Sequence, residues 1–310
     1  MRTFEKFLNY LLQNPLLKRS NILNDFLTIF KDNDFLTKKQ SYSLLKPPKT
    51  AKELKTQSGL IKTAFDGEQE NALQNIQQNA ELNVSILRKL KTHYKSLVNE
   101  MQSVSARLRE ISMLWNELYK VATMYNDNDD VKKMFTLMSN YSKQWSECEL
   151  RRSKLVKLEI KEYFSYVNKE FMTMKDMCVK AEGLKMNYYK ESERLGNRKE
   201  ELFRKGDFVK WELKEEDKRN TSQLMGNKRL AKEKMLPKET ARVDEVKCFY
   251  GAALNEIIKE YERHKNLSGV NHANVISEYC RKEMGELVVM QGGLADTIAN
   301  LYEATMRIVV

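Results

Sequence analysis

An apolar stripe between Leu73 and Tyr125 constrains this 310-residue chain more than any other feature of its sequence. At alternating steps of three and four residues along this stretch, every side chain is apolar except Asn83. A stripe that repeats every 3.5 residues is typical of a helix that packs along its whole length against other helices. At a rise of 1.5 Å per residue, such a helix would extend roughly 80 Å, which a compact globule does not need.

Two further long helices are predicted after the first, which we place at about 70–125. The cluster Asn126–Asp130 supplies turn-forming and helix-capping side chains, and the second helix follows over 131–205. Pro237 suits the first turn of a third helix, 237–308, with a kink or an irregular turn expected around Gly269. Three antiparallel helices that share apolar stripes predict an all-α, elongated coiled-coil bundle, and further apolar faces would let two copies associate.

The first hairpin of this bundle is predicted to supply its core. The two tryptophans on either side of the first turn fall about level in an antiparallel pair, where they would pack close together. The residues assigned to the dimer or bundle core are Leu87, Leu90, Leu97, Met101, Leu108, Trp115 and Trp145.

The composition agrees with long helices and disfavours several other classes of protein. The chain has only 11 Gly and 4 Pro, too few for the many turns of a sandwich, a barrel or a βαβ fold. Hydrophobic residues make up 41%, too many for a disordered chain. No run of 18 apolar residues occurs, so no membrane span is expected.

Catalytic and metal-binding patterns find no support in the sequence. The four cysteines are scattered without a CxxC pair, which indicates reduced thiols in a cytosolic protein, and there are only three histidines. No GxxxxGK[ST], HExxH or GxSxG motif is present. We therefore expect no enzyme activity, no metal and no cofactor.

The net charge of +11 is concentrated in two blocks. Residues 1–65 carry a net +7 and residues 180–238 a net +6, whereas residues 239–310 carry a net −3. Such a pattern points to an anionic partner, either a membrane or a nucleic acid. Nucleic acid is not expected, because no recognised module appears and aromatic residues are not interleaved with the basic ones.

The second basic block is the predicted membrane-binding tip, and a smaller cluster lies in the middle of the second long helix. The alternative interpretation is a solvated helix end for the tip and a simply solvated helix surface for the mid-helix cluster. The tip residues are Arg198, Lys199, Arg204, Lys205, Lys210, Lys214, Lys218, Arg219, Lys228, Arg229, Lys232 and Lys234. The mid-helix residues are Arg151, Arg152, Lys154 and Lys157.

Residues 51–66 are predicted to form a short basic amphipathic helix, with apolar residues on one face and lysines toward the other. Such a helix could insert at a membrane interface, or could pack on the neighbouring domain. The residues proposed for insertion are Leu54, Lys55, Leu60, Ile61, Lys62 and Phe65.

The N-terminal region carries a motif that resembles a known family. Two short helices are predicted, at 3–14 and from Ser20 to Phe30, and residues 33–50, with Pro47-Pro48, are predicted to be extended. The stretches Phe4-Glu5-Lys6-Phe7-Leu8, Asn14-Pro15-Leu16-Leu17 and Phe26-Leu27 resemble the closing helices of a phosphoinositide-binding PX domain. Together with an amphipathic helix, three long helices and the MLPKET segment that opens the third, they make the chain similar to the sorting nexins that carry a BAR domain.

The resemblance implies a domain plan and a function. Residues 1–44 would be the closing helices of an incomplete PX-like domain, 45–50 a linker, 51–66 the amphipathic helix and 67–310 the BAR domain. The PX strands and the Arg-Arg-Tyr-type motif are absent from this chain. A member of this family would be a cytoplasmic protein that is peripheral on endosomal membranes and binds anionic, phosphoinositide-containing lipid. It would form a curved dimer with an identical chain or with another BAR-domain sorting nexin, and would sense or generate curvature in endosomal sorting and vesicle or tubule trafficking. A coiled-coil tethering protein without lipid contact is the alternative.

Overall fold

The computed structural model describes residues 8, 12, 21–29, 32–43, 63–206, 208–218 and 221–309. Every regular element within these ranges is a helix, which confirms the predicted all-α class. The chain divides into two compact units. Unit 1 comprises Met1–Ala80 with Thr173–Arg263, and unit 2 comprises Glu81–Met172 with His264–Val310.

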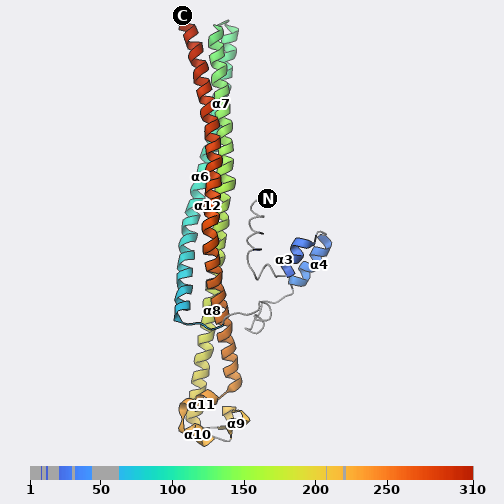
Figure 1. Cartoon of the computed structure of the whole chain (residues 1–310), viewed down its shortest axis with the longest axis vertical. Helices are drawn as coiled ribbons and strands as arrows, with labels where there is room; N and C mark the ends of the chain where they lie inside the picture. The colour runs from blue at the N-terminus through green and yellow to red at the C-terminus, as the bar shows by residue number, and fades with distance from the viewer. Residues whose placement is uncertain are drawn as a thin grey trace. The chain divides into compact units, whose positions relative to one another are not determined.

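Unit 2 is a bundle of long helices, as the apolar stripes predict. It contains most of α6 (Gly67–Met124), all of α7 (Asp129–Leu155), the π-helical turn η1 (Val156–Lys161), the start of α8 (Glu162–Lys205) and the second part of α12 (Pro237–Val309). Figure 1 shows α6, α7 and α12 side by side in this unit.

The turn between α6 and α7 forms where the polar cluster predicts it. Asn126 adopts a left-handed conformation with φ 55°, which Asn tolerates better than most residues. The side chain of Asn128 caps α7 by accepting a hydrogen bond from the backbone N–H of Asp130 at 2.8 Å. The acidic side chains of Asp129 and Asp130 lie in the first turn of α7, where the helix dipole favours negative charge.

Two local predictions about these helices are corrected. Trp115 does not pack on Trp145: its ring stacks on Phe135 at 5.9 Å, whereas the Trp145 ring lies beside Tyr141. The reason is the register of the hairpin. Ser112 is hydrogen-bonded to Ser139 and Ser105 to Ser146, so Trp145 lies level with residues near Ser105 and not with Trp115. The irregular turn expected around Gly269 is also absent, because α12 continues through this residue as a helix.

Unit 1 contains the C-terminal part of α8, the first part of α12 and the short helices between them. These are the 3₁₀ turn η2 (Phe208–Trp211), α9 (Glu215–Lys218), α10 (Thr221–Gly226) and α11 (Lys228–Lys234). Figure 1 shows the short helices gathered at the end of the α8–α12 pair. They enclose a separate hydrophobic core, whose buried members are Leu195, Leu202, Trp211, Leu213, Leu224, Ala231, Met235 and Leu236.

Near the N-terminus the structure describes α3 (Asn21–Thr28) and α4 (Asp32–Ser43). Helix α3 lies within the predicted second helix. Helix α4 corrects the prediction that residues 33–50 are extended, because the helix breakers that suggested it, Pro47 and Pro48, lie beyond its end. The carboxylate of Asp25 joins the two helices by accepting a hydrogen bond from the hydroxyl of Tyr42 and pairing with Lys38 at 3.6 Å.

Candidate functional site

The tip segment, residues 198–234, is folded around the indole ring of Trp211. This side chain is 0% exposed, and its Nε1–H donates a hydrogen bond to the carbonyl oxygen of Leu202 at 3.2 Å. Its ring lies 6.0 Å from that of Phe203 and 4.8 Å from that of Phe208. The backbone carbonyl of Trp211 also accepts a hydrogen bond from the N–H of Leu236 at 2.9 Å, which ties η2 to the residue directly before α12.

Residues with positive φ make the reversals that bring these short helices together. Gly206 follows α8 with φ 63°, a conformation that glycine adopts without steric cost. Glu212 and Leu236 also have positive φ, at 50° and 52°, on either side of the tip core. Asn227 caps α11 by accepting a hydrogen bond from the N–H of Leu230 at 3.1 Å. The tip segment is therefore a folded cap and not an open loop.

Several predicted tip residues serve to hold this cap together. Glu200 on α8 lies between Lys228 and Lys232 on α11, with an O–N distance of 2.6 Å to Lys228. Hydrogen bonds from Lys228 and then Lys232 lower the pKa of the Glu200 carboxyl to about 2. Lys234 pairs with Asp217 at 3.3 Å, which joins α11 to α9.

Lys199 and Arg198 are positioned differently from what the charge pattern predicts. Lys199 is only 8% exposed, and its Nζ donates a hydrogen bond to Thr240 Oγ1 at 2.7 Å. Burial lowers the pKa of this lysine. The guanidinium of Arg198 pairs with Glu239 on α12. Both side chains thus connect α8 to α12, and Lys199 is too buried to contact a surface.

Most of the predicted tip residues, including Lys228 and Lys234, also contribute to an exposed basic surface. Arg219 lies outside the residues that the structure describes. Lys205 and Lys218 are exposed and have acidic neighbours, Glu201 and Glu215, on their own helices. The exposed basic side chains are Arg204, Lys205, Lys210, Lys214, Lys218, Lys228, Arg229 and Lys234.

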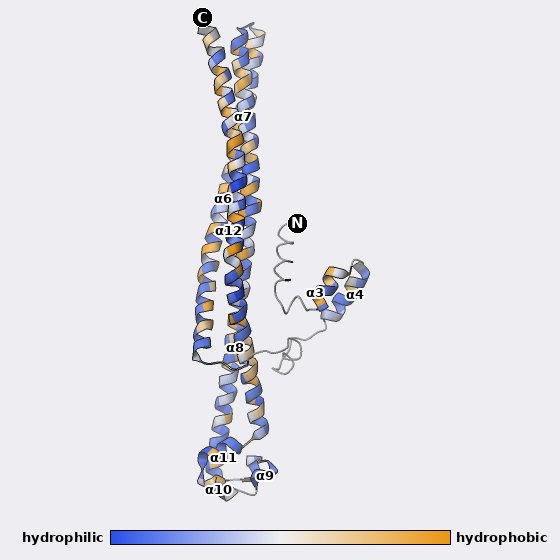
Figure 2. Cartoon of the chain, in the orientation of Figure 1, coloured by the Kyte–Doolittle hydropathy of each residue, from blue (hydrophilic) through white to orange (hydrophobic). Residues whose placement is uncertain are grey.

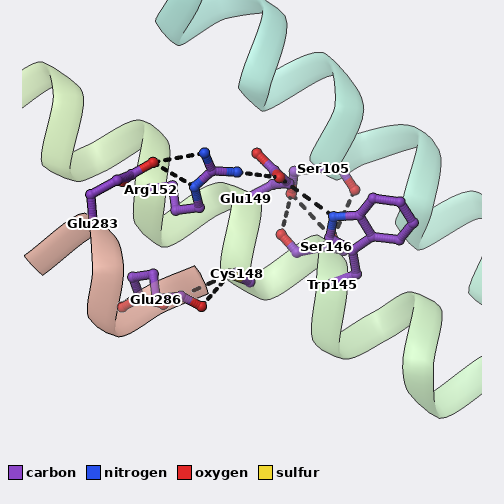
Figure 3. Close-up of polar contacts among 8 residues, drawn as sticks. All are labelled: Ser105, Trp145, Ser146, Cys148, Glu149, Arg152, Glu283 and Glu286. Atoms are coloured by element: carbon purple, nitrogen blue, oxygen red, sulfur yellow. Dashed lines mark hydrogen bonds and ion pairs between the residues drawn. The ribbon is translucent and has the colours of Figure 1, made fainter. Parts of the chain in front are cut away.

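The mid-helix cluster lies in unit 2, where acidic residues pair with its two arginines. Arg151 Nε lies 2.8 Å from an oxygen of Glu286, and Arg152 bridges Glu149 and Glu283, each at 2.7 Å. Figure 3 shows the Arg152 guanidinium between these two carboxylates, so that it joins α7 to α12. Lys154 and Lys157 are exposed. The two arginines therefore stabilise the bundle, and only the two lysines retain the predicted role as a hypothesis.

Most of the predicted amphipathic helix, residues 51–62, lies outside the described part of the chain. This range includes five of the residues proposed for insertion: Leu54, Lys55, Leu60, Ile61 and Lys62. Its last residues, 63–66, are described and are not helical. The reason is that Asp66 caps α6. Its Oδ1 accepts hydrogen bonds from the N–H groups of Glu68 and Gln69, and Gln69 Oε1 accepts one from the N–H of Asp66.

Phe65 packs on protein, which is the alternative considered for this segment. Its ring makes edge-to-face contacts with Tyr250 at 4.8 Å and Tyr188 at 6.3 Å. The side-chain amide of Asn255 donates a hydrogen bond to the carbonyl oxygen of Ala64 at 2.9 Å. Helix α12 allows this approach because its residue 251 is glycine, where an added Cβ would lie 2.0 Å from the carbonyl oxygen of Thr63.

In unit 2 the apolar stripe of α6 does not all face inward. Leu87, Met101 and Leu108 are buried, and Leu90, Trp115 and Trp145 are half-buried. A line of apolar residues spaced by seven is 41–45% exposed: Leu97, Val104, Ile111 and Leu118. Apolar residues of α12 in the same unit are exposed as well, among them Met284, Val288, Ile298 and Tyr302. Figure 2 shows apolar stretches recurring along both helices.

Serine side chains occupy buried positions at the contact between α6 and α7. Ser105 and Ser112 on α6 are buried against Ser146 and Ser139 on α7 and bond to them directly. Small side chains let two helices approach closely, but a serine does not add to an apolar stripe. The sequence therefore gave little signal for these contacts. Trp211 was also missed, although an aromatic residue within a charged stretch is a usable sign of a buried anchor.

No protein-family model matches the chain, and no curated protein sequence is significantly similar to it. Among solved structures, the crystal structure of the Hof1p F-BAR domain superposes with a TM-score of 0.52 at 12% identity, covering 77% of this chain and 90% of that one. The cryo-EM structure of the SNX-BAR Mvp1 tetramer superposes with a TM-score of 0.46 at 14% identity, covering 93% of this chain and 76% of that one. The likeness to the F-BAR domain shows a shared BAR-type helical fold. Within the described residues, no helix is both long enough and apolar enough to cross a membrane.

Proposed function

We propose that this chain is a peripheral membrane scaffold that dimerises, binds anionic membrane through its tip segment, and senses or generates curvature. The observation that carries the proposal is the exposed basic surface on a cap whose own fold is fixed by Trp211. Each Lys or Arg close to an anionic bilayer contributes about 1 kcal/mol. Three or four such residues acting together would bind a membrane without any pocket.

The exposed apolar line of α6 supports dimerisation. Leu97, Val104, Ile111 and Leu118 repeat every seven residues, which is the spacing of a helix seam. Their exposure in a single chain leaves this seam without a partner helix in the described part of unit 2. A second BAR-type chain, either identical or related, fits a seam of this kind. Two joined chains present two tip segments, so that each binding event raises the effective concentration of the other tip at the membrane.

The finer parts of the proposal, phosphoinositide binding and endosomal sorting, rest on the resemblance of residues 4–27 to the end of a PX domain. Most of this stretch lies outside the described residues, and α3 belongs to it. The charge of residues 1–65, a net +7, also favours an anionic surface. We place the protein on the cytoplasmic side of endosomal membranes on this basis.

Co-sedimentation with vesicles of phosphatidylcholine and phosphatidylserine, at low salt and with several vesicle diameters, tests the proposal. The decisive variant reverses Arg204, Lys214 and Arg229 to Glu. We choose these residues because they are exposed and, among the residues that the structure describes, no ion pair joins them to an acidic side chain, unlike Lys228 and Lys232, which hold Glu200. The matched control makes the same change at Arg88, Lys91 and Lys95, three exposed residues of α6.

We expect the tip variant to lose most of its binding, and the control to bind like the unmodified chain. A preference for vesicles of one diameter supports curvature sensing. If the unmodified chain forms dimers but does not bind vesicles at low salt, the membrane proposal is wrong and the tethering alternative replaces it. If the control variant loses as much binding as the tip variant, the tip segment is not the contact surface.

A further inference from the structure

An apolar side chain projects from the basic surface of the tip segment. Val209 is 89% exposed, more than any other large apolar residue that the structure describes. Its neighbour Phe208 is 40% exposed. Single exposed apolar residues are common on proteins and need no explanation by themselves. The setting of Val209 makes it different, because its position is fixed and it belongs to a segment with a net basic charge.

The core of the tip holds Val209 in place. Both Val209 and Phe208 belong to the 3₁₀ turn η2, which ends at the fully buried Trp211. The Phe208 ring rests against the indole of Trp211 at 4.8 Å between ring centroids. The hydrogen bonds of Trp211 to Leu202 and Leu236 then fix the whole turn to α8 and to the residue directly before α12. Because the Val209 side chain is held in contact with water in this way, it contributes almost no hydrophobic burial to the stability of the folded chain.

Exposed lysines flank the turn on both sides in sequence. Lys205 precedes it, Lys210 lies within it, and Lys214 follows it, and all three side chains are exposed. Two acidic residues are interspersed with them, Glu201, which pairs with Lys205, and the exposed Glu212. The tip segment as a whole carries 12 basic and 8 acidic residues, a net +4. An apolar side chain that projects from a net basic segment matches an anionic lipid surface, in which phosphates lie outside and hydrocarbon lies beneath. A protein partner with an acidic rim would need a shaped apolar pocket, whereas a bilayer needs only access. The charge complementarity therefore favours lipid.

We infer that η2 is a membrane-inserting wedge: Val209, with the exposed edge of Phe208, enters the interfacial region of an anionic bilayer while Lys205, Lys210 and Lys214 contact phosphate. This inference rests on the proposed membrane function and adds a mode of binding to it. Electrostatic contact alone is screened within about 10 Å at 0.1 M salt. Burial of an apolar side chain is not screened, so it makes part of the binding resistant to salt.

The test uses Val209→Ser in the full chain, with Val179→Ser as the matched control. Val179 is 53% exposed on α8, outside the tip segment, and Phe208 is left unchanged because it packs on Trp211. Affinity for vesicles of phosphatidylcholine with phosphatidylserine is measured at low and high salt. Removing a buried valine side chain corresponds to about tenfold weaker binding. We expect this loss for Val209→Ser at both salt concentrations, and no change for Val179→Ser.

A second measurement reports insertion directly. Val209→Trp and Val179→Trp are compared for tryptophan emission and for quenching by lipids brominated in the acyl chain, after subtraction of the spectrum of the unmodified chain. We expect a blue shift and quenching for Val209→Trp alone. If the unmodified chain binds vesicles but Val209→Trp is not quenched and Val209→Ser binds equally well, the wedge is wrong and the electrostatic proposal stands. If the unmodified chain does not bind, both proposals fail.

Discussion

Ser105 on α6 and Ser146 on α7 exchange two hydrogen bonds across the helix pair. Ser105 Oγ donates to the carbonyl oxygen of Ser146 at 2.8 Å, and Ser146 Oγ donates to that of Ser105 at 2.7 Å. Figure 3 shows the two serines facing each other between the helices. Seven residues along, Ser112 and Ser139 make a similar contact, with Ser139 Oγ donating to the carbonyl oxygen of Ser112 at 2.9 Å. These pairs set the register of the α6–α7 hairpin.

Enlarging one of these serines should therefore destabilise unit 2. Ser105→Leu places a large side chain where two backbones approach closely, and overpacking of this kind costs about 1–3 kcal/mol. Ser103→Leu, an exposed site two residues away, should change the stability by less than about 0.5 kcal/mol. Urea unfolding followed by circular dichroism measures both variants. Equal midpoints for the two would contradict close packing at Ser105.

If the exposed apolar line of α6 is the dimer interface, introducing negative charge into it should prevent self-association. In Val104→Glu/Ile111→Glu, two carboxylates replace apolar groups that would otherwise be buried, each worth about 1.5–3 kcal/mol. We expect this variant to sediment as a monomer while it keeps its helical content. Val179→Glu, at an exposed position of α8, is the control and should sediment like the unmodified chain. A double variant with the mass of the unmodified assembly would show that this face is not the interface.

How far the sequence determines this fold can be argued from α6. Its stripe identifies the helix and its length, because a heptad pattern has no other simple explanation. The stripe does not say which of two adjacent lines faces inward. Leu97, Val104 and Ile111 are the more apolar line, but Val98, Ser105 and Ser112 are the buried one. Hydrogen bonding and close approach decide the choice, and neither property appears in hydropathy.

The position of the candidate site along the chain can be predicted from the sequence, but the pairing of its side chains cannot. Charge counting finds the basic block of residues 180–238, since net charge is additive along the sequence. It does not find that Lys199 is buried or that Lys228 and Lys232 hold Glu200, because pairing depends on how α8 and α11 meet. It also misses Val209, whose significance depends on the outward direction that Trp211 imposes on η2.

Gly251 predicts how the segment before α6 is held. An added Cβ would overlap the Thr63 carbonyl at 2.0 Å, and a backbone atom cannot move aside as a flexible side chain can. Gly251→Ala should release residues 63–65 from α12, expose Phe65 and increase hydrogen exchange at the start of α6. Gly183→Ala, on α8 in the same unit, has no atom within 4 Å of the added group and should stabilise the helix by up to about 1 kcal/mol. Equal protection of the start of α6 in both variants would contradict this role of Gly251.

His272 predicts a dependence of stability on pH in unit 2. Its Nδ1 is hydrogen-bonded to the hydroxyl of Tyr163, and the neighbouring His264 pairs with Glu170 at 3.2 Å. Burial, followed by the charge of His264, lowers the pKa of His272 in the folded chain, although Glu170 opposes the shift. Above the unfolded pKa of about 6.5 the histidine is neutral in both states, and its stabilising contribution is complete.

As the pH falls below about 6.5, the unfolded chain binds the proton first, so the free energy of unfolding decreases until the folded pKa is reached. Urea midpoints at several pH values between about 7.5 and 5 should therefore fall for the unmodified chain and fall less steeply for His272→Gln. His93→Gln, which removes an exposed histidine from α6 in the same unit, should keep the slope of the unmodified chain. Identical slopes for His272→Gln and His93→Gln would show that His272 does not control this pH dependence.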